Sequence, residues 1–335
     1  MIKKNVSLKH YNTFGVDVNA KEFASVKSLE DLKSILKSNP LKLLVLGGGS
    51  NVLLTKNVEA LVLHINLKGI EICEKNNKTT QIKVAAGENW HDFVMWTLDR
   101  NLGGLENLSL IPGNIGTAPI QNIGAYGVEL KDSFISCEAV NLKTLEIEIF
   151  SNDDCKFEYR NSIFKSEYKG QYIITAVTFE LTNIDHKLKT AYGAITTELK
   201  QMGVLTPTIQ DISKAVIAIR QSKVPDPKKL GNSGSFFKNP VVSKETFEKL
   251  LKQFPNMPNY AVSKMEVKIP AGWLIETAGF KGKTFGNHGV HKHQALVLVN
   301  YGGASGHDIL ALSKLIQTTI KTIFGIVLET EVIIL

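Results

Sequence analysis

One segment, residues 103–130, restricts the possible folds more than any other part of the chain. It mixes six glycines, two prolines and three asparagines with isolated apolar residues, and neither the helical nor the strand period persists through it. A stretch of this length without regular structure is usually functional or disordered. Its aliphatic content argues against disorder. We therefore expect an ordered, irregular loop that holds a ligand, with a long surface loop as the alternative.

The composition is that of an ordinary globular protein with a diffuse positive charge. The chain has 335 residues, enough for two or three domains, and is 43% hydrophobic and 21% charged, which permits a sizeable core. The net charge of +7 is spread along the chain, without blocks of like charge or basic stretches interleaved with aromatics. The sequence therefore favours small anionic ligands and no nucleic acid.

Cysteine usage and hydropathy bear on the compartment. The three cysteines, Cys73, Cys137 and Cys155, are odd in number, far apart and without a C-x-x-C pair. This pattern indicates a reducing compartment and argues against disulfides or a cysteine-ligated metal. The N-terminus lacks the apolar core of a signal peptide, and no apolar stretch approaches the ~18–20 residues that span a bilayer. We expect a cytoplasmic protein without membrane insertion.

Periodicity predicts mixed helices and strands on both sides of the irregular segment. The expected helices begin at 28–31 or cover 89–100, 211–221, 243–254, 271–278 and 305–325. The expected strands cover 42–46, 52–54, 61–64, 82–86, 173–181, 294–300 and 326–335. The pattern of predicted strands gives way to one of predicted helices and Gly-rich turns near residue 207, where we place a domain boundary.

Two loops have the composition of a nucleotide-cofactor site. The first comprises Gly47, Gly48, Gly49, Ser50 and Asn51 between two predicted strands. Glycines without Cβ atoms let backbone N–H groups converge on an anion such as a pyrophosphate, although the G-x-G-x-x-G spacing is absent and a tight hairpin turn is the alternative. The second, residues 111–127, is dense in Gly and Pro with Asn and Gln at intervals, so it can fold around a flat ligand and read the polar edge of a flavin ring.

These loops, together with Asn12-Thr-Phe-Gly15, resemble the UDP-N-acetylenolpyruvoylglucosamine reductase family. The resemblance continues in order over nearly the whole chain, and several of its motifs run to ten residues. The later motifs are Tyr159-Arg-Asn-Ser-Ile-Phe164, Arg220-Gln-Ser-Lys223-Val-Pro-Asp-Pro227, Gly231-Asn-Ser-Gly-Ser-Phe-Phe-Lys-Asn-Pro240, Ala271-Gly-Trp-Leu-Ile-Glu276, Gly289-Val-His-Lys-His-Gln-Ala-Leu-Val-Leu-Val-Asn300 and Leu328-Glu-Thr-Glu-Val332.

The resemblance implies an α+β fold with a two-lobed FAD-binding unit of the vanillyl-alcohol-oxidase/PCMH type and a C-terminal α+β substrate-binding domain. We expect the FAD-binding unit at 1–206, with lobes at about 1–68 and 69–206, and the substrate domain at 207–335. Non-covalent FAD is expected to contact the 47–51 loop and the following residues of the second loop: Pro112, Gly113, Gly116, Thr117, Pro119, Gln121, Asn122, Gly124, Ala125 and Tyr126.

The activity that the resemblance implies is reduction of UDP-N-acetylglucosamine enolpyruvate to UDP-N-acetylmuramate for peptidoglycan synthesis, with NADPH as co-substrate and a monomeric enzyme. Arg160, Ser235 and Glu331 form the implied catalytic set. Arg160 offers a planar fork of donors to the enediolate that develops as hydride arrives. Ser235 delivers the proton to the carbanion carbon, and Glu331 orients a proton or water, or holds the enolic form. From residue type alone, Arg160 reads as a surface residue and Ser235 as a turn former, whereas Glu331 in a terminal strand needs a partner.

Four further residues are implied substrate contacts. Tyr192 lies where one subgroup of the family carries a tyrosine on a loop that closes over the nucleotide sugar. Lys223, Asn239 and Gln294 match contacts to the phosphates and sugar, with a surface lysine, an Asn-Pro turn and a strand-edge glutamine as the alternatives. We expect no metal site, because no H-E-x-x-H pattern accompanies the histidines of 288–293.

Two rival functions stay open at this point. A flavin oxidase or dehydrogenase of the same FAD-binding fold explains the loops at 47–51 and 111–127 but not the later motifs. A non-catalytic sensor of the nucleotide sugar predicts binding without turnover, and the presence of all three catalytic residues argues against it.

Overall fold

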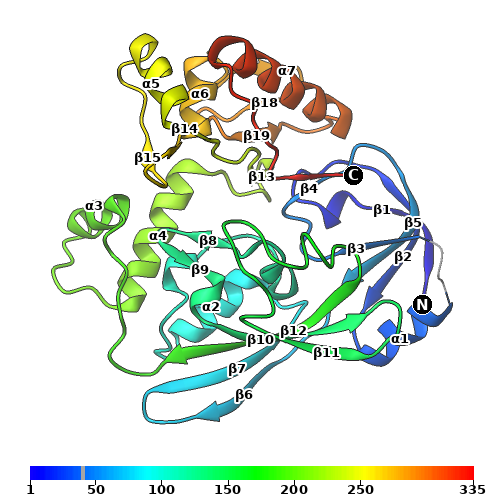
Figure 1. The fold of residues 1–335 in the computed structure, drawn as a ribbon. Helices are drawn as coiled ribbons and strands as arrows, with labels where there is room; N and C mark the ends of the chain where they lie inside the picture. The colour runs from blue at the N-terminus through cyan, green and yellow to red at the C-terminus, as the bar shows by residue number, and fades with distance from the viewer. Residues whose placement is uncertain (39–41) are drawn as a thin grey trace. The chain divides into compact units, whose positions relative to one another are not determined.

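The computed structural model describes residues 1–38 and 42–335 (Figure 1). The chain forms two compact units and crosses between them several times. Unit 1 comprises residues 1–6, 20–48 and 58–221; unit 2 comprises residues 7–19, 49–57 and 222–335. The predicted domains 1–206 and 207–335 stay a prediction, because compactness does not establish which parts fold independently.

Unit 1 contains a four-stranded sheet with one helix. Its strands are β1 (Lys3–Ser7), β2 (Asn19–Val26), β3 (Leu43–Leu46) and β5 (Val58–Ile65), in the order β1-β2-β5-β3, and both β2 and β3 run parallel to β5. Helix α1 (Leu29–Ser38) begins as predicted, with the Ser28 Oγ accepting the Asp31 N–H at 3.1 Å. It buries Leu32 and Leu36.

A five-stranded antiparallel sheet forms the larger part of unit 1. Its strands are β6 (Ile70–Lys75), β7 (Thr79–Ala85), β10 (Phe134–Asn141), β11 (Ile147–Ser151) and β12 (Tyr172–Thr182), in the order β11-β10-β12-β7-β6. Helix α2 (Trp90–Leu98) packs Trp90 and Phe93 against Phe179 of β12. The strands predicted at 61–64, 82–86 and 173–181 are confirmed.

The irregular segment 103–130 is ordered, as predicted, and most of it is buried. It forms the short 3-10 helices η2 (Glu106–Leu108), η3 (Ile115–Thr117) and η4 (Pro119–Gln121), the hairpin β8 (Gly124–Ala125) and β9 (Val128–Glu129), and the start of η5 (Leu130–Asp132). A Cβ on Gly116 would lie 2.5 Å from the Ala86 Cβ, so only glycine lets this segment reach the end of β7. The segment is therefore part of the core.

Two helices complete unit 1. Helix α3 (Gly193–Gln201), which the sequence did not predict, packs Ile195 and Leu199 against Ile212 and Val216 of α4 (Ile209–Lys223). The β-branched run at the start of α3 has a low helical propensity, so this helix depends on packing against α4.

Unit 2 contains a four-stranded antiparallel sheet in the order β13-β19-β18-β17. Its strands are β13 (Gly231–Ser235), β17 (Thr284–Phe285), β18 (His288–Val290) and the fully buried β19 (Val297–Asn300). The other elements of unit 2 are η1 (Lys9–Tyr11), β4 (Val52–Leu53), β14 (Val241–Ser243), α5 (Lys244–Gln253), β15 (Tyr260–Ala261), β16 (Glu266–Lys268), α6 (Ala271–Thr277), α7 (Gly306–Phe324) and β20 (Ile333–Ile334).

Helix α7 confirms the predicted helix ends. Ser305 and Asp308 form a reciprocal capping box, with Ser305 N–H to Asp308 Oδ2 at 2.8 Å and Asp308 N–H to Ser305 Oγ at 3.2 Å. Gly325 ends the helix with φ 67°, the left-handed conformation that glycine adopts without strain.

Within residues 1–38 and 42–335, no helix is long and apolar enough to cross a membrane.

The predicted strand over 326–335 is wrong in its extent. Only β20 pairs as a strand, parallel to β4. Before β20 the chain is extended but lies beside a different segment, because the Glu331 N–H donates to the Phe236 carbonyl at 2.8 Å. No single strand runs beside the segment for its whole length, so no continuous ladder forms. The alternation of buried and less buried side chains persists. Ile326, Leu328 and Val332 are buried, whereas Glu331, at an odd-numbered position, is half-buried.

The first residues of α7 and α3 give a matched test of close packing. A Cβ on Gly306 would lie 1.9 Å from the Leu54 carbonyl oxygen, whereas a Cβ on Gly193 meets nothing within 4 Å. Gly306→Ala should therefore lower the free energy of unfolding by about 1–3 kcal/mol. Gly193→Ala should leave it unchanged or raise it by up to ~1 kcal/mol. Thermal unfolding of both variants checks this, and equal midpoints would contradict the packing argument.

Candidate active site

The two predicted cofactor loops touch each other within unit 1. A Cβ on Gly48 would lie 2.7 Å from the Asn114 Oδ1 and 3.0 Å from the Gly113 Cα, and one on Gly47 would lie 2.6 Å from the Thr117 Cγ2. The glycines of the first loop are therefore required so that its backbone can lie against the second loop. Bare backbone at the meeting of two loops is the arrangement that a dinucleotide pyrophosphate needs, so these residues fit FAD.

The rest of the first loop, Gly49 to Asn51, belongs to unit 2 and supports the chain end there. Gly49 has φ 60°, and its carbonyl accepts the Thr13 N–H at 3.0 Å. The Asn51 side chain donates to the Glu331 carbonyl at 3.2 Å, and the Asn51 carbonyl accepts the Ile333 N–H at 3.0 Å. Asn51 thus ties the predicted cofactor loop to the segment that carries Glu331.

Three residues that are not predicted site residues, His91, Leu110 and Arg220, fix the start of the second loop. Leu110 has φ 57°, a strained backbone for a leucine. Its N–H donates to the His91 Nδ1 at 3.0 Å and its carbonyl accepts the Arg220 Nε–H at 3.1 Å. Burial lowers the pKa of His91 and so favours the neutral ring that can accept this bond. Because these three residues are far apart in the sequence, no local pattern could have identified the clamp.

Arg220 also connects Tyr126 with Arg160. Burial raises the pKa of Tyr126, and a hydrogen bond with Arg220 opposes this shift. Burial lowers the pKa of Arg220, and the positive charge of Arg160 acts in the same direction. Two guanidinium groups that repel each other are placed to attract an anion.

Arg160 itself lies against the second loop. It has φ 56°, in a tight turn closed by the bridge between Glu158 and Asn161. The Arg160 Nη2 donates to the Gly124 carbonyl at 2.5 Å, and the Arg160 backbone carbonyl accepts the Lys165 Nζ at 3.0 Å. The guanidinium is thereby held beside a predicted flavin contact, although the local backbone is strained.

Asn122 differs from the other predicted cofactor contacts. It is fully buried, and its amide donates to Glu129 Oε2 at 3.0 Å and the Glu158 carbonyl at 3.1 Å while accepting the Lys131 N–H at 3.2 Å. These bonds occupy the side chain in holding the loop together. The remaining predicted contacts lie along the same loop: Pro112, Gly113, Gly116, Thr117, Pro119, Gln121, Gly124, Ala125 and Tyr126.

The backbone segments of Ser235 and Glu331 are joined at Phe236 within unit 2. Exposed Ser235 ends β13 next to a bulge at Gly234, which has φ 67°. The following residue, Phe236, is fully buried, donates its N–H to the Leu296 carbonyl at 2.8 Å and accepts the Glu331 N–H at 2.8 Å. Phe236 therefore fixes the backbone on which both predicted catalytic side chains stand.

Three predicted substrate contacts also lie in unit 2, two of them at the start of α6. The Asn239 Oδ1 accepts the Ala271 N–H at 2.9 Å, and the Gln294 Oε1 would lie 3.0 Å from a Cβ on Gly272. Lys223 is exposed at the end of α4. Burial lowers the pKa of His291, and a hydrogen bond with the Lys223 backbone opposes that shift.

Tyr192, the fourth predicted substrate contact, belongs to unit 1 and directly precedes α3. Its ring is half exposed and meets the Tyr126 ring edge-on, with 5.5 Å between the centroids. The tyrosine of the predicted substrate loop thus lies next to a tyrosine of the predicted flavin loop.

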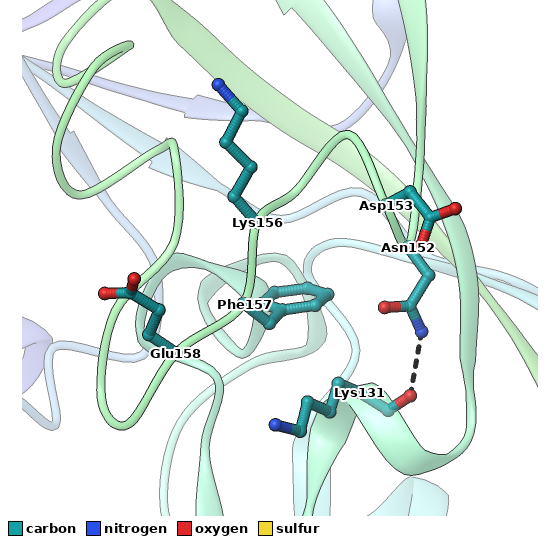
Figure 2. Close-up of a pocket in the computed structure, with 6 residues that line it drawn as sticks. All are labelled: Lys131, Asn152, Asp153, Lys156, Phe157 and Glu158. Atoms are coloured by element: carbon teal, nitrogen blue, oxygen red, sulfur yellow. Dashed lines mark hydrogen bonds between the residues drawn. The ribbon is translucent and has the colours of Figure 1, made fainter.

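Outside the predicted site residues, the described part of the chain has a pair of neighbouring histidines and a surface pocket. The rings of His291 and His293 lie 5.5 Å apart, and the residues that the structure describes contain no group of three His, Cys, Asp or Glu side chains placed to bind a metal. Unit 1 has a surface pocket of about 340 Å³, and Figure 2 draws the residues that line it. It is lined by Lys131, Asn152, Asp153, Lys156, Phe157 and Glu158. None of these is a predicted site residue.

Comparison with known proteins gives the same assignment along the whole chain. A family model for an FAD binding domain matches residues 20–146, and one for the C-terminal domain of UDP-N-acetylenolpyruvoylglucosamine reductase matches residues 226–335. The reductase of that name from Flavobacterium johnsoniae is 59% identical over 332 residues, covering 99% of this chain and 98% of the relative. The one from Pseudomonas fluorescens is 46% identical over 333 residues, covering 98% of each.

A solved structure agrees with the fold. The UDP-N-acetylenolpyruvylglucosamine reductase (MurB) from Thermus caldophilus is similar with a TM-score of 0.70 at 23% identity, covering 100% of this chain and 99% of that one. The predicted α+β class, with an FAD-binding unit and a C-terminal α+β domain, is confirmed. Identity of 59% along nearly the full length shows that this chain belongs to the UDP-N-acetylenolpyruvoylglucosamine reductase family, the FAD-dependent oxidoreductases of peptidoglycan precursor synthesis.

Proposed function

We propose that this protein reduces UDP-N-acetylglucosamine enolpyruvate to UDP-N-acetylmuramate with NADPH, as a cytoplasmic monomer that binds neither nucleic acid nor membrane. The name of its Flavobacterium relative and the FAD binding family model support this reaction. The observation that carries it is the pairing of Ser235 and Glu331 around Phe236, whose carbonyl accepts the Glu331 N–H at 2.8 Å. This backbone bond joins the segment that carries a hydroxyl to the segment that carries a carboxylate, and these two groups can deliver and control a proton.

The residues of the two loops hold the cofactor in this proposal. Gly47, Gly48 and the 112–126 segment bind FAD through their backbone, without a covalent bond. FAD bound there would supply the hydride-transfer chemistry between NADPH and the enolpyruvyl double bond. Because NADPH leaves before the nucleotide sugar enters, the kinetics are ping-pong.

Arg160 stabilises the negative charge that develops on the substrate carboxylate. Its donors form a planar fork that matches two carboxylate oxygens. Arg220 adds a second positive charge, and an anion near both guanidinium groups relieves their mutual repulsion. The bond to the Gly124 carbonyl fixes the Arg160 head group before substrate arrives, so little reorganisation accompanies the reaction.

Ser235 gives its proton to the substrate carbon next to the carboxylate. A serine hydroxyl is a weak acid, so Lys223 or an ordered water assists it. Glu331 orients the proton or holds the enolic form by hydrogen bonding. Tyr192, Lys223, Asn239 and Gln294 bind the phosphates and sugar of the substrate. Asn239 is suited to this task because its side-chain Oδ1 is already fixed by the Ala271 N–H at 2.9 Å.

The Ser235 assignment predicts a separation of the two half-reactions. In anaerobic absorbance measurements, Ser235→Ala should bleach the flavin with NADPH at close to the unaltered rate. Return of the oxidised spectrum on adding UDP-N-acetylglucosamine enolpyruvate should slow by at least ~100-fold, since general acid catalysis contributes about 10²–10⁴-fold. Equal slowing of both steps would refute this role for Ser235. Unaltered protein that recovers only in air would instead be an oxidase.

The contact between the two loops predicts a loss of cofactor. Gly48→Ala places a Cβ against the Asn114 side chain and the Gly113 backbone, so the loops must separate. We expect purified Gly48→Ala to carry less than about half the FAD of the unaltered protein, because overpacking of this kind costs about 1–3 kcal/mol. Gly193→Ala, whose Cβ meets nothing within 4 Å, is the control. The ratio of flavin to protein absorbance measures occupancy, and full occupancy in Gly48→Ala would contradict the loop contact.

A further inference from the structure

Asn107 is a buried polar residue of η2 to which the proposed mechanism gives no role. Only 1% of it is exposed. Its Nδ2 donates to two backbone carbonyls at once, that of Tyr126 at 3.0 Å and that of Lys189 at 2.8 Å. A single amide group therefore ties the predicted flavin loop to the segment that leads into Tyr192.

The orientation of the Asn107 amide follows from its neighbours. Both groups facing Nδ2 are carbonyl oxygens, so a flipped amide would set oxygen against oxygen. The Oδ1 is buried and has no hydrogen-bond partner among residues 1–38 and 42–335. An unpaired buried acceptor is unfavourable, so stability alone does not account for an asparagine at this position.

The two loops that Asn107 joins carry two tyrosines in contact. The rings of Tyr126 and Tyr192 meet edge-on at 5.5 Å between centroids. A second bond, from the Thr196 Oγ1 to the Thr190 carbonyl at 2.8 Å, anchors the same segment to α3. Lys189 is thus held to η2 and Thr190 to α3, directly before the half-exposed Tyr192 ring.

We propose that Asn107 is a positioning residue that sets Tyr192 against the Tyr126 loop and so fixes the affinity for the nucleotide-sugar substrate. Asn107 acts through the Lys189 carbonyl and does not touch the substrate. This inference rests on the proposed function, in which Tyr192 binds the nucleotide sugar. Tyr126 is also bonded to Arg220, so the flavin loop stays in place when the Asn107 bond is lost.

The test replaces the donor with an acceptor of the same shape. Asn107→Asp turns an N–H₂ group that serves two carbonyls into an oxygen that repels them. In the holoenzyme we expect KM for UDP-N-acetylglucosamine enolpyruvate to rise about tenfold, equivalent to about 1.4 kcal/mol. Flavin content and the rate of bleaching by NADPH should stay unchanged. Amide hydrogen exchange at residues 188–192 should become faster.

Asn152→Asp is the matched control. The Asn152 Nδ2 also donates to two carbonyls, those of Lys131 at 2.8 Å and Phe134 at 2.9 Å, and the first of these bonds is drawn in Figure 2. The same substitution there removes the same kind of bonds away from the Tyr192 segment. It should leave KM and the exchange at 188–192 unchanged. Asn107→Ala, which removes the donor without adding an acceptor, replaces Asn107→Asp if the latter does not fold.

The outcomes separate this inference from the proposed function. Unchanged exchange at 188–192 in both Asn107 variants would overturn the inference, as would a KM no higher than that of Asn152→Asp or a parallel loss of FAD. Tyr192→Phe tests the underlying assignment, because loss of its hydroxyl should raise KM. Faster exchange in Asn107→Asp together with an unchanged KM in Tyr192→Phe would show that the clamp exists but that Tyr192 does not bind the substrate.

Discussion

The backbone bonds around Glu331 are the constraint on which the C-terminal half of the site depends. Glu331 gives its N–H to the Phe236 carbonyl at 2.8 Å, and its own carbonyl accepts the Asn51 side chain at 3.2 Å. The Ile333 N–H also donates to the Asn51 carbonyl at 3.0 Å, so main-chain bonds connect the segments that carry the predicted proton donor, the predicted carboxylate and the predicted cofactor loop. Main-chain bonds do not depend on side-chain rotamers, so this arrangement is already organised before a ligand binds.

In unit 1 the site is also organised before a ligand binds, and there the organisation involves strained backbone conformations. Leu110, Tyr126 and Arg160 all have left-handed backbones, with φ of 57°, 51° and 56°. Such conformations are unfavourable for non-glycine residues and persist only where surrounding bonds hold them. His91 and Arg220 hold Leu110, Arg220 also bonds Tyr126, and Gly124 holds Arg160. Arg220 takes part in two of these restraints, which connects the geometry of the flavin loop with the charge around Arg160.

Local patterns predicted much of the fold but not all of it. The start of α1 and both ends of α7 follow from capping residues, and the strand near 173–181 follows from its β-branched and aromatic run. Helix α3 was missed because its sequence has a low helical propensity and α4 supplies its stability. The C-terminal strand was predicted too long because alternation reports which face is buried, whereas a ladder also needs one neighbour along its whole length. That neighbour changes between Phe236 and β4.

The same distinction applies to the site. Glycine loops and long motifs indicate cofactor chemistry because the residue type carries the reason, such as a missing Cβ at Gly48. Supporting residues leave no such signal. Asparagine and histidine occur in proteins for many reasons, so their presence in a sequence does not indicate a role. Asn107 acquires its role only because folding brings it to the Lys189 carbonyl, and His91 only because folding brings it to the Leu110 N–H. The parts of a site that touch a ligand can therefore be inferred from sequence, while the parts that hold those residues in place require the structure.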